Sequence, residues 1–211
     1  ATDACGNAST FDQIINLTDD EAPTFTIACP ADVTLSADEN CSADTSVESN
    51  GSATFADLMD NCDDDVDVTI SSSDATASPC EGSLVITRTW TITAEDHCNN
   101  ITTLTCDQTI TVNDDTAPSI TCPADLTVEC DGMGNADALA GFLAGVSATD
   151  NCSDVTITNN FDALSDDCGA TGSATVTFTA TDACGNQSSC DATFTIEDTT
   201  APSLTIEGPA N

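Results

Sequence analysis

Apolar and polar residues alternate along much of the chain, which is the period of a β-strand with one buried face. In the stretch 173–181, Val176, Phe178 and Ala180 alternate with threonines. Ile86, Trp90 and Ile92 do the same in the stretch 83–94. This pattern predicts matching sets of strands in the two halves of the chain. They cover 24–35, 52–56, 66–71, 83–94 and 101–112 in the first half, and 119–128, 146–149, 154–159, 173–181 and 190–196 in the second.

One segment, residues 135–145, breaks this alternation. Asn135 is a candidate N-cap, Leu139 and Phe142 begin an apolar face that Leu143 completes, and Gly145 is a candidate stop, so we predict a short helix. Every other predicted element is a strand. The fold class is therefore all-β, and antiparallel strands with few long connections favour an immunoglobulin-like β-sandwich.

The chain is internally repetitive. An Ala-Pro pair recurs at 22–23, 117–118 and 201–202, and the segment ATDACGN occurs at both 1–7 and 180–186. Self-similarity at a fixed period indicates tandem modules that each form one structural unit. We predict the tail of a preceding module at 1–21, full modules at 22–116 and 117–200, and the start of a following module at 201–211.

Six cysteines recur in the same order in both modules. They are Cys29, Cys41, Cys62, Cys80, Cys98 and Cys106, matched by Cys122, Cys130, Cys152, Cys168, Cys184 and Cys190. Spacing alone leaves their pairing open. The strand order puts the second and fourth at one end of a module and the third and fifth at the other, with the first and sixth facing inward. We therefore predict the bonds Cys29–Cys106, Cys41–Cys80, Cys62–Cys98, Cys122–Cys190, Cys130–Cys168 and Cys152–Cys184, with Cys5 pairing outside this chain segment to an upstream third-position cysteine.

The composition indicates where the protein is located and excludes two classes of partner. Aromatic residues make up only 4% of the chain, so each core is thin and depends on the disulfides that 13 cysteines permit. Such bonds indicate an oxidising, extracellular location. One basic residue faces 37 acidic ones, giving a net charge of −36. A field of that sign repels nucleic acids and anionic membranes, so we exclude both as partners.

The acidic residues also suggest a structural calcium site. Several carboxylates without basic neighbours repel one another unless a hard cation lies among them, and Ca²⁺ accepts six to eight oxygens. Junction and loop aspartates recur at equivalent places in the repeats. The predicted ligands are Asp19, Asp20, Asp60, Asp96, Asp114, Asp115, Asp150, Asp182 and Asp198. The alternative is a solvated surface with aspartates in turns, where they are favoured anyway. Residues 63–65 are interpreted as such a solvated loop.

The chain offers little for catalysis. His97 is the only histidine, and Ala183 takes its place in the second module. Spacing singles out no nucleophile beside it, so we predict an exposed loop residue and a protein that is not an enzyme. Trp90 occupies the position of Val176 and is predicted to be a core residue, not a platform for sugar binding.

The motifs CPADxT, TATDACGN and DTTAP, in this order, resemble hyalin-repeat (HYR-like) immunoglobulin-type modules. The six-cysteine form is similar to repeats of large Bacteroidota surface proteins, such as SprB-type gliding adhesins. That resemblance implies a cell-surface stalk, type IX secretion, a role in gliding motility and O-glycosylation at Thr116 and Thr199, which would compete with metal binding there. The segment 94–100 (AEDHCNN) departs from ATDACGN, and its missing glycine puts the turn of that loop in question.

Together these features predict a structural stalk repeat of an extracellular adhesin or filament, with modules stacked end to end as a rod. The first and last strands of a module run parallel, so a module is entered at one end and left at the other. Its partners would be neighbouring repeats of the same long chain or other filament chains, and other regions would bind the surface or glycan target. A self-assembling filament subunit and a glycan-binding module are the alternatives.

Overall fold

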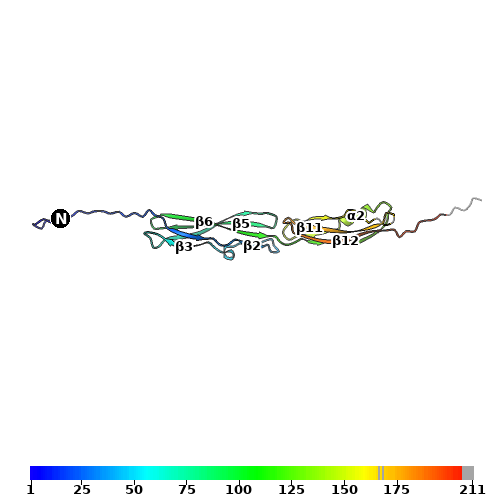
Figure 1. Cartoon of the computed structure of the whole chain (residues 1–211), viewed down its shortest axis with the longest axis horizontal. Helices are drawn as coiled ribbons and strands as arrows, with labels where there is room; N and C mark the ends of the chain where they lie inside the picture. Colours follow the sequence, from blue (N-terminus) through cyan, green and yellow to red (C-terminus); the bar gives the residue numbers. More distant parts are fainter. Residues whose placement is uncertain (166, 168, 206–211) are drawn as a thin grey trace, which may run out of the picture. The chain divides into compact units, whose positions relative to one another are not determined.

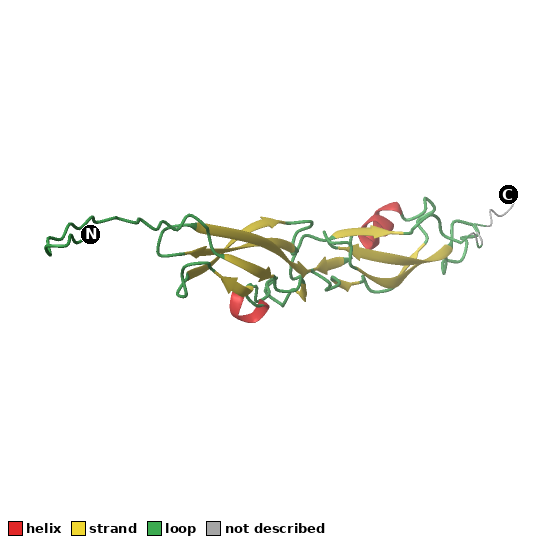
Figure 2. Cartoon of the chain, turned by 60° about the vertical axis from the view of Figure 1, so that its left-hand side comes forward, coloured by secondary structure: helices red, strands yellow, loops and turns green. Residues whose placement is uncertain are grey.

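A computed structural model describes residues 1–165, 167 and 169–205. Strands dominate it, with two short helices among the described residues, as Figure 2 shows. The fold is all-β with disulfide bonds and a helix in the second half, as predicted. The elements, several of which are labelled in Figure 1, are β1 (Thr24–Ala28), β2 (Val33–Ser36), α1 (Val47–Asn50), β3 (Thr54–Met59), β4 (Asp67–Ala77), β5 (Leu84–Glu95), β6 (Ile101–Asn113), β7 (Ser119–Thr121), β8 (Leu126–Glu129), α2 (Ala136–Leu143), β9 (Ser147–Thr149), β10 (Thr156–Asn159), β11 (Gly172–Thr181) and β12 (Gln187–Glu197).

Contacts between residues divide the chain into two compact units. Unit 1 consists of Ala1–Asp32, Ser46–Ala75 and Thr87–Thr109. Unit 2 consists of Val33–Thr45, Thr76–Ile86 and Ile110–Asn211. The strands β4, β5 and β6 contribute residues to both units. This division follows contacts and not sequence similarity, so the module boundaries inferred from the repeats stay a prediction.

The first strand predicted in each repeat is in fact two strands that lie in different sheets. β1 pairs antiparallel with β3, whereas β2 pairs parallel with β6. The second repeat does the same, with β7 beside β9 and β8 parallel to β12. The predicted parallel relation of the first and last strands is thus correct for β2 with β6 and for β8 with β12.

A Cys-Pro-Ala-Asp segment produces each change of sheet. Pro30 has no N–H to donate to a ladder, so the first strand ends there. Asp32 then accepts a hydrogen bond from the backbone N–H of Thr109 at 2.7 Å, and Asp125 accepts one from Thr193 at the same distance. These bonds anchor the chain as it enters the second sheet. The resulting sheets have the orders β1-β3 and β2-β6-β5-β4, and β7-β9 and β10-β11-β12-β8.

The core of unit 2 is aromatic in spite of the low aromatic content. Phe178 of β11 and Phe194 of β12 are fully buried, and Phe142 of α2 packs against both, with ring centroids 6.0 and 5.4 Å away. Leu139 and Leu143 of the same helix face also pack against this cluster. The predicted apolar face of the helix is therefore the face that covers the core.

Asn135 precedes α2 but does not cap it with its side chain, contrary to expectation. Its backbone is left-handed, with φ of 51°, and its side-chain amide donates to the carbonyl of Glu129 at 2.8 Å. It therefore anchors the loop before the helix. The helix ends at Leu143, with Ala144 at the C-cap, one residue before the predicted stop at Gly145. None of the described helices is long and apolar enough to span a membrane.

Unit 1 has a smaller core. Trp90 is only 3% exposed and packs with Ile92 and Ala53, so it is a core residue as expected. Arg88, two residues earlier on β5, is also buried and binds Asp74 in a bidentate ion pair, with Nε–Oδ1 at 2.8 Å and Nη2–Oδ2 at 2.9 Å. The single basic side chain is thus used inside the fold.

The disulfide bonds differ from the predicted set. Cys29–Cys106 and Cys122–Cys190 are present, and these four cysteines pack against the cores, as expected for inward-facing residues. Cys41, however, bonds Cys152, and Cys80 bonds Cys184, in place of the predicted Cys41–Cys80 and Cys152–Cys184. A disulfide requires Cα atoms about 4.4–6.8 Å apart. In unit 2 these two pairs meet that condition, at 5.2 and 5.3 Å.

Four of the described cysteines are in no disulfide bond. Cys5, Cys62, Cys98 and Cys130 are free. The predicted Cys62–Cys98 bond is therefore wrong for this structure. The predicted Cys130–Cys168 bond involves a residue that lies outside the described part of the chain. Pairing within one repeat does not hold for Cys41, Cys80, Cys152 and Cys184, because the bonds join the second and fourth cysteines of the first repeat to the third and fifth of the next.

Candidate metal sites

The loop between the last two strands of each repeat is built around one aspartate. In unit 1, Asp96 Oδ1 accepts the backbone N–H groups of Cys98 and Asn100, both at 2.8 Å. The side-chain amide of Asn100 donates to Asp96 Oδ2 at 2.7 Å. Asp182 makes the same bonds in unit 2, with Cys184 at 2.9 Å and Asn186 at 2.8 Å. Asp-x-Cys-x-Asn is therefore a self-contained turn, which the sequence encodes locally.

The missing glycine of the first repeat does not change this turn. Gly185 has φ of 90°, and Asn99 stands in its place with φ of 69°. Asparagine tolerates the left-handed region better than most residues. Both loops close with a backbone bond from this residue to the aspartate carbonyl, at 3.2 Å for Asn99 and 3.3 Å for Gly185.

The asparagine that ends each turn also binds the segment that leads into the repeat. Asn100 donates to the backbone carbonyl of Asp19 at 3.2 Å, and Asn186 donates to that of Asp114 at 3.1 Å. Sequence reasoning did not identify these asparagines as positioning residues. The signal was present, because the Asp-x-Cys-x-Asn pattern occurs at Asp3, Asp96 and Asp182.

A second aspartate turn approaches the same place from the loop after β3 or β9. Asp60 Oδ1 accepts the N–H groups of Cys62 and Asp63, both at 2.9 Å. Asp150 Oδ2 accepts those of Cys152 and Ser153, at 2.7 and 3.1 Å. Each turn uses only one carboxylate oxygen in these bonds, so the other is available.

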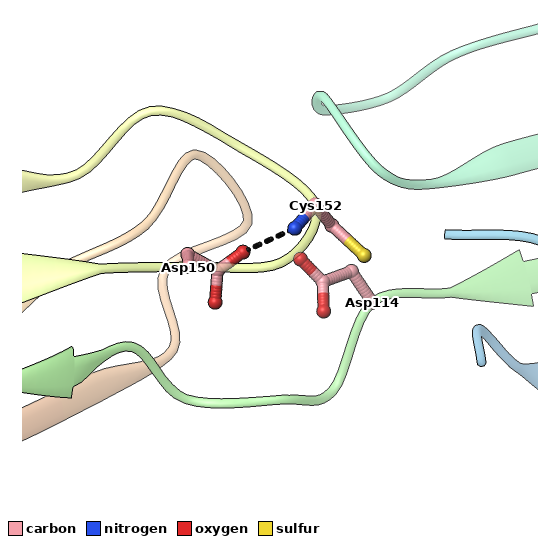
Figure 3. Close-up of side chains that lie close together, drawn as sticks. All are labelled: Asp114, Asp150 and Cys152. Atoms are coloured by element: carbon pink, nitrogen blue, oxygen red, sulfur yellow. Dashed lines mark hydrogen bonds between the residues drawn. The ribbon is translucent and has the colours of Figure 1, made fainter. Parts of the chain in front are cut away.

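These loops bring acidic side chains together within each unit. In unit 1, one carboxylate oxygen each of Asp19, Asp60 and Asp96 lies within 4.8 Å of the others. In unit 2, Asp114 and Asp150 are grouped in the same way with the sulfur of Cys152, and Figure 3 shows the carboxylates of Asp114 and Asp150 side by side. Because Cys152 is in a disulfide bond, its sulfur is not a thiolate ligand. The donors are therefore carboxylate oxygens.

Buried oxygens without partners distinguish these clusters from an ordinary acidic surface. Among the described residues, Asp60 Oδ2, Asp114 Oδ2 and Asp150 Oδ1 are buried and accept no hydrogen bond. Asp114 as a whole is only 5% exposed. A buried carboxylate oxygen without a partner is costly. Hard oxygen donors that lack hydrogen bonds fit a hard cation such as Ca²⁺, which takes carboxylate and backbone oxygens, better than Zn²⁺, which prefers sulfur and nitrogen.

The charges at the unit 2 cluster are mutually unfavourable. Burial raises the pKa of Asp114, and the charges of Asp150, Asp182 and Asp115 raise it further, while the N–H of Thr116 partly opposes them. At Asp96 burial also disfavours ionisation, but the hydrogen bonds from Asn100 and Cys98 outweigh it and lower the pKa. A bound cation would offset the repulsion at Asp114 directly.

Several predicted ligands lie outside the two groups. Asp20 and Asp198 are exposed, and Asp198 accepts the N–H of Thr200 at 3.0 Å. Asp115 accepts the hydroxyl of Ser36 at 2.7 Å. Asp182 is buried and contributes its charge to the Asp114 cluster without belonging to the group of close oxygens. The structure thus brings together Asp19, Asp60, Asp96, Asp114 and Asp150 out of the nine predicted ligands.

The remaining candidate residues are at the surface. Thr116 and Thr199 are exposed, and the hydroxyl of Thr199 donates to Glu129 at 2.7 Å. His97 is exposed and its ring contacts Asp63. Hydrogen bonds from the N–H of Asp65 and from His97 lower the pKa of Asp63 to about 2, so this part of the 63–65 loop is tied by local hydrogen bonds.

Comparisons with known proteins show only distant structural likeness. No family model and no curated protein matches the chain. Among solved structures it is similar to Drosophila N-cadherin EC1-4, with 17% identity, 84% of this chain and 50% of that chain covered, and a TM-score of 0.32. Protocadherin gammaB7 EC3-6 is 14% identical, with 86% of this chain and 52% of that chain covered and a TM-score of 0.32. Human CDH23 EC21-23 is 14% identical, with 81% of this chain and 70% of that chain covered and a TM-score of 0.31. The chain spans about half the length of the first two. These scores identify no function.

Proposed function

We propose that this chain is a structural repeat segment of an extracellular stalk or filament, held by covalent bonds and stiffened by calcium. The observation that supports this most directly is the pairing of Cys41 with Cys152 and of Cys80 with Cys184. Each bond joins one sequence repeat to the next. A tensile load along the chain is then carried by covalent bonds as well as by the thin cores.

An extracellular location follows from the same bonds. Disulfides persist in oxidising compartments and are reduced in the cytosol. The net charge of −36 keeps a long array soluble and discourages close association with anionic surfaces. The more specific assignments, a Bacteroidota gliding adhesin exported by type IX secretion, rest on the motif resemblance alone. A glycan-binding role has less support, because the single tryptophan, Trp90, is in the core.

Calcium would act where the segment between repeats meets the two loops. In unit 2 the ion would be held by Asp114 and Asp150, and in unit 1 by Asp19, Asp60 and Asp96. It would supply positive charge among these carboxylates, and would tie the incoming segment to the loops that surround it. Asn186 and Asn100 already hold that segment by its backbone.

A force experiment on single molecules tests the mechanical role. The chain, pulled by its ends while oxidised, should release little length, because the disulfides close overlapping loops with sequence separations of 77, 111, 104 and 68 residues. After reduction with dithiothreitol, the length released on unfolding should increase by most of the chain between Cys29 and Cys190. Equal released lengths before and after reduction would rule out the covalent load path.

A titration tests the calcium part separately. Thermal unfolding of the oxidised chain is followed in calcium, in magnesium at equal ionic strength, and in excess chelator. We expect calcium alone to raise the melting temperature, since the site offers several carboxylates in a flexible cage. A response equal to that in magnesium, or none, would mean that the clusters are only an acidic surface. Asp162→Asn, an exposed carboxylate in unit 2, is the control for loss of one charge.

A further inference from the structure

The two disulfides of unit 2 that join different sequence repeats follow one rule. The second cysteine of the first repeat, Cys41, bonds the third cysteine of the second repeat, Cys152. The fourth cysteine, Cys80, bonds the fifth, Cys184. A repeat therefore offers its second and fourth cysteines to a following repeat, and its third and fifth cysteines to a preceding one.

Cys62 and Cys98 are the third and fifth cysteines of the first repeat, and they are exposed and free. Their loops nonetheless have the geometry of the bonded loops. The N–H of Cys62 donates to Asp60 at 2.9 Å, as that of Cys152 donates to Asp150 at 2.7 Å. The N–H of Cys98 donates to Asp96 at 2.8 Å. The backbone of these loops thus matches that of the loops whose cysteines are bonded.

The second repeat carries the complementary pair. Cys130 corresponds to Cys41 and is half-buried and free. Cys168 corresponds to Cys80 in the sequence, although it lies outside the described residues. Among the described residues, Cys62, Cys98 and Cys130 thus stay outside the internal bonds.

We propose that Cys62 and Cys98 form a covalent docking site for another repeat of this kind, and that a second copy of this chain can supply it through Cys130 and Cys168. The bonds would be Cys62–Cys130 and Cys98–Cys168, following the internal rule. Such a contact is head-to-tail, so it propagates into a linear array and does not close a dimer. It deepens the proposed stalk function, on which it rests, by naming the partner and the bonds.

The chemistry requires an oxidant, for which a small disulfide such as oxidised glutathione is sufficient. A thiolate attacks the glutathione disulfide and releases one glutathione thiol, and the partner thiolate then displaces the second. Formation of each protein disulfide removes two protons and two electrons from two cysteine thiols and reduces one oxidised glutathione to two glutathione thiols. Two bonds therefore consume two molecules of oxidised glutathione.

The rival product is closure within one repeat, as Cys62–Cys98 and Cys130–Cys168. The second repeat argues against it, because Cys152 and Cys184, in the positions of Cys62 and Cys98, bond to a different repeat and not to each other. The exposed Cys5 is the remaining free thiol among the described residues. It is therefore replaced by serine in every protein of the experiment, so that it forms no links of its own.

The experiment compares three chains in a glutathione redox buffer, all carrying Cys5→Ser. One has no other change, the second also carries Cys62→Ser and Cys98→Ser, and the third carries Cys130→Ser and Cys168→Ser. Products are separated without reductant, and their disulfides are mapped by mass spectrometry of peptides. We expect a ladder of linked chains from the first protein. The second and third should each stay monomeric alone, but should form a dimer with each other through Cys62–Cys130 and Cys98–Cys168.

Three results would overturn the proposal: closed Cys62–Cys98 in a monomer, free thiols after oxidation, or links that persist in either double variant alone. None of these would touch the proposed function, because the force and calcium experiments probe bonds and carboxylates inside one chain. Conversely, a ladder of linked chains combined with equal released lengths before and after reduction would support the docking site and contradict the proposed stalk function.

Discussion

The two acidic clusters have equivalent residues but different covalent surroundings. At the Asp114 cluster the neighbouring cysteines, Cys152 and Cys184, are bonded to the preceding repeat. At the Asp19 cluster the equivalent cysteines, Cys62 and Cys98, are free. The aspartate turns are nevertheless the same, with matching hydrogen bonds. The turns are therefore a property of the local sequence, since they are the same with and without a disulfide at the cysteine.

The largest expected effect comes from making the Asp114 cluster resemble the Asp19 cluster. Replacing Cys41, Cys80, Cys152 and Cys184 by alanine removes bonds with sequence separations of 111 and 104 residues. We expect the free energy of unfolding to fall by about 4–8 kcal/mol, because each of the two cross-links restricts the unfolded chain and typically contributes about 2–4 kcal/mol. Denaturant unfolding measures the loss. Cys5→Ser, at a free exposed cysteine, should change it little, and an equal loss in that control would contradict the prediction.

The clusters can next be compared through calcium. At a free calcium concentration 100 times Kd, one site should stabilise the chain by about 2.7 kcal/mol. Asp114→Asn should remove this gain at the unit 2 site, and in chelator it should leave stability unchanged or higher, because Asp114 is buried among like charges. Asp19→Asn tests the unit 1 site in the same way.

Calorimetry with calcium gives the number of sites in each variant. Loss of one site in Asp114→Asn and of one in Asp19→Asn, with none lost in Asp162→Asn, is the expected result. If both cluster variants kept the wild-type number, the ligands would lie elsewhere.

Two glycines with positive φ differ in how closely the chain packs against them, and one of them, Gly82, lies at the unit 2 cluster. Gly82 has φ of 89°, and a Cβ on it would lie 2.7 Å from Cβ of Cys152. Gly185 has φ of 90° with nothing within 4 Å of such a Cβ. Gly82→Ala should therefore cost roughly 2 kcal/mol or more, and Gly185→Ala about 1 kcal/mol from backbone strain alone. Thermal unfolding of the two variants measures the difference, and equal losses would show that the contact yields without cost.

The smallest effect concerns the ion pair between Arg88 and Asp74 in the first repeat. Arg88 corresponds to Ala174, two residues before Val176. Arg88→Met keeps the apolar stem but should cost about 1 kcal/mol at neutral pH, a modest value because Asp74 is partly exposed. The hydrogen bond from Arg88 lowers the pKa of Asp74 below 3.8. The contribution is thus present above pH 3.8 and lost as the pH falls through the lower, folded-state pKa.

Unfolding free energies of wild type and Arg88→Met, measured from neutral to acidic pH, should therefore converge at the acidic end. A gap that stays constant across this range would assign the loss to packing and not to the ion pair.

Much of the fold was predictable because its signals are local. Alternation of apolar and threonine residues marked the long strands, and the face of Leu139 and Phe142 marked the helix. The division of the first strand was missed, although Pro30 and Pro123 were visible, because a proline can also lie on an edge strand. At the candidate site, five of nine predicted ligands come together. Asp20, Asp115 and Asp198 lie outside the two groups, because recurrence before Ala-Pro does not say which way a side chain points, and Asp182 accepts the hydrogen bonds of its own turn.

The strands and the aspartate turns can be inferred from the sequence because each depends on residues within a few positions of one another, and the repeat can be inferred because the same motifs recur along the chain. Which cysteines form disulfide bonds depends instead on the folded chain. The pairing of Cys41 with Cys152 depends on Cα atoms 111 residues apart approaching to 5.2 Å. No periodicity encodes such an approach. The burial that leaves Asp114 Oδ2 without a partner was decided in the same way, because it depends on loops from distant parts of the chain closing around one carboxylate.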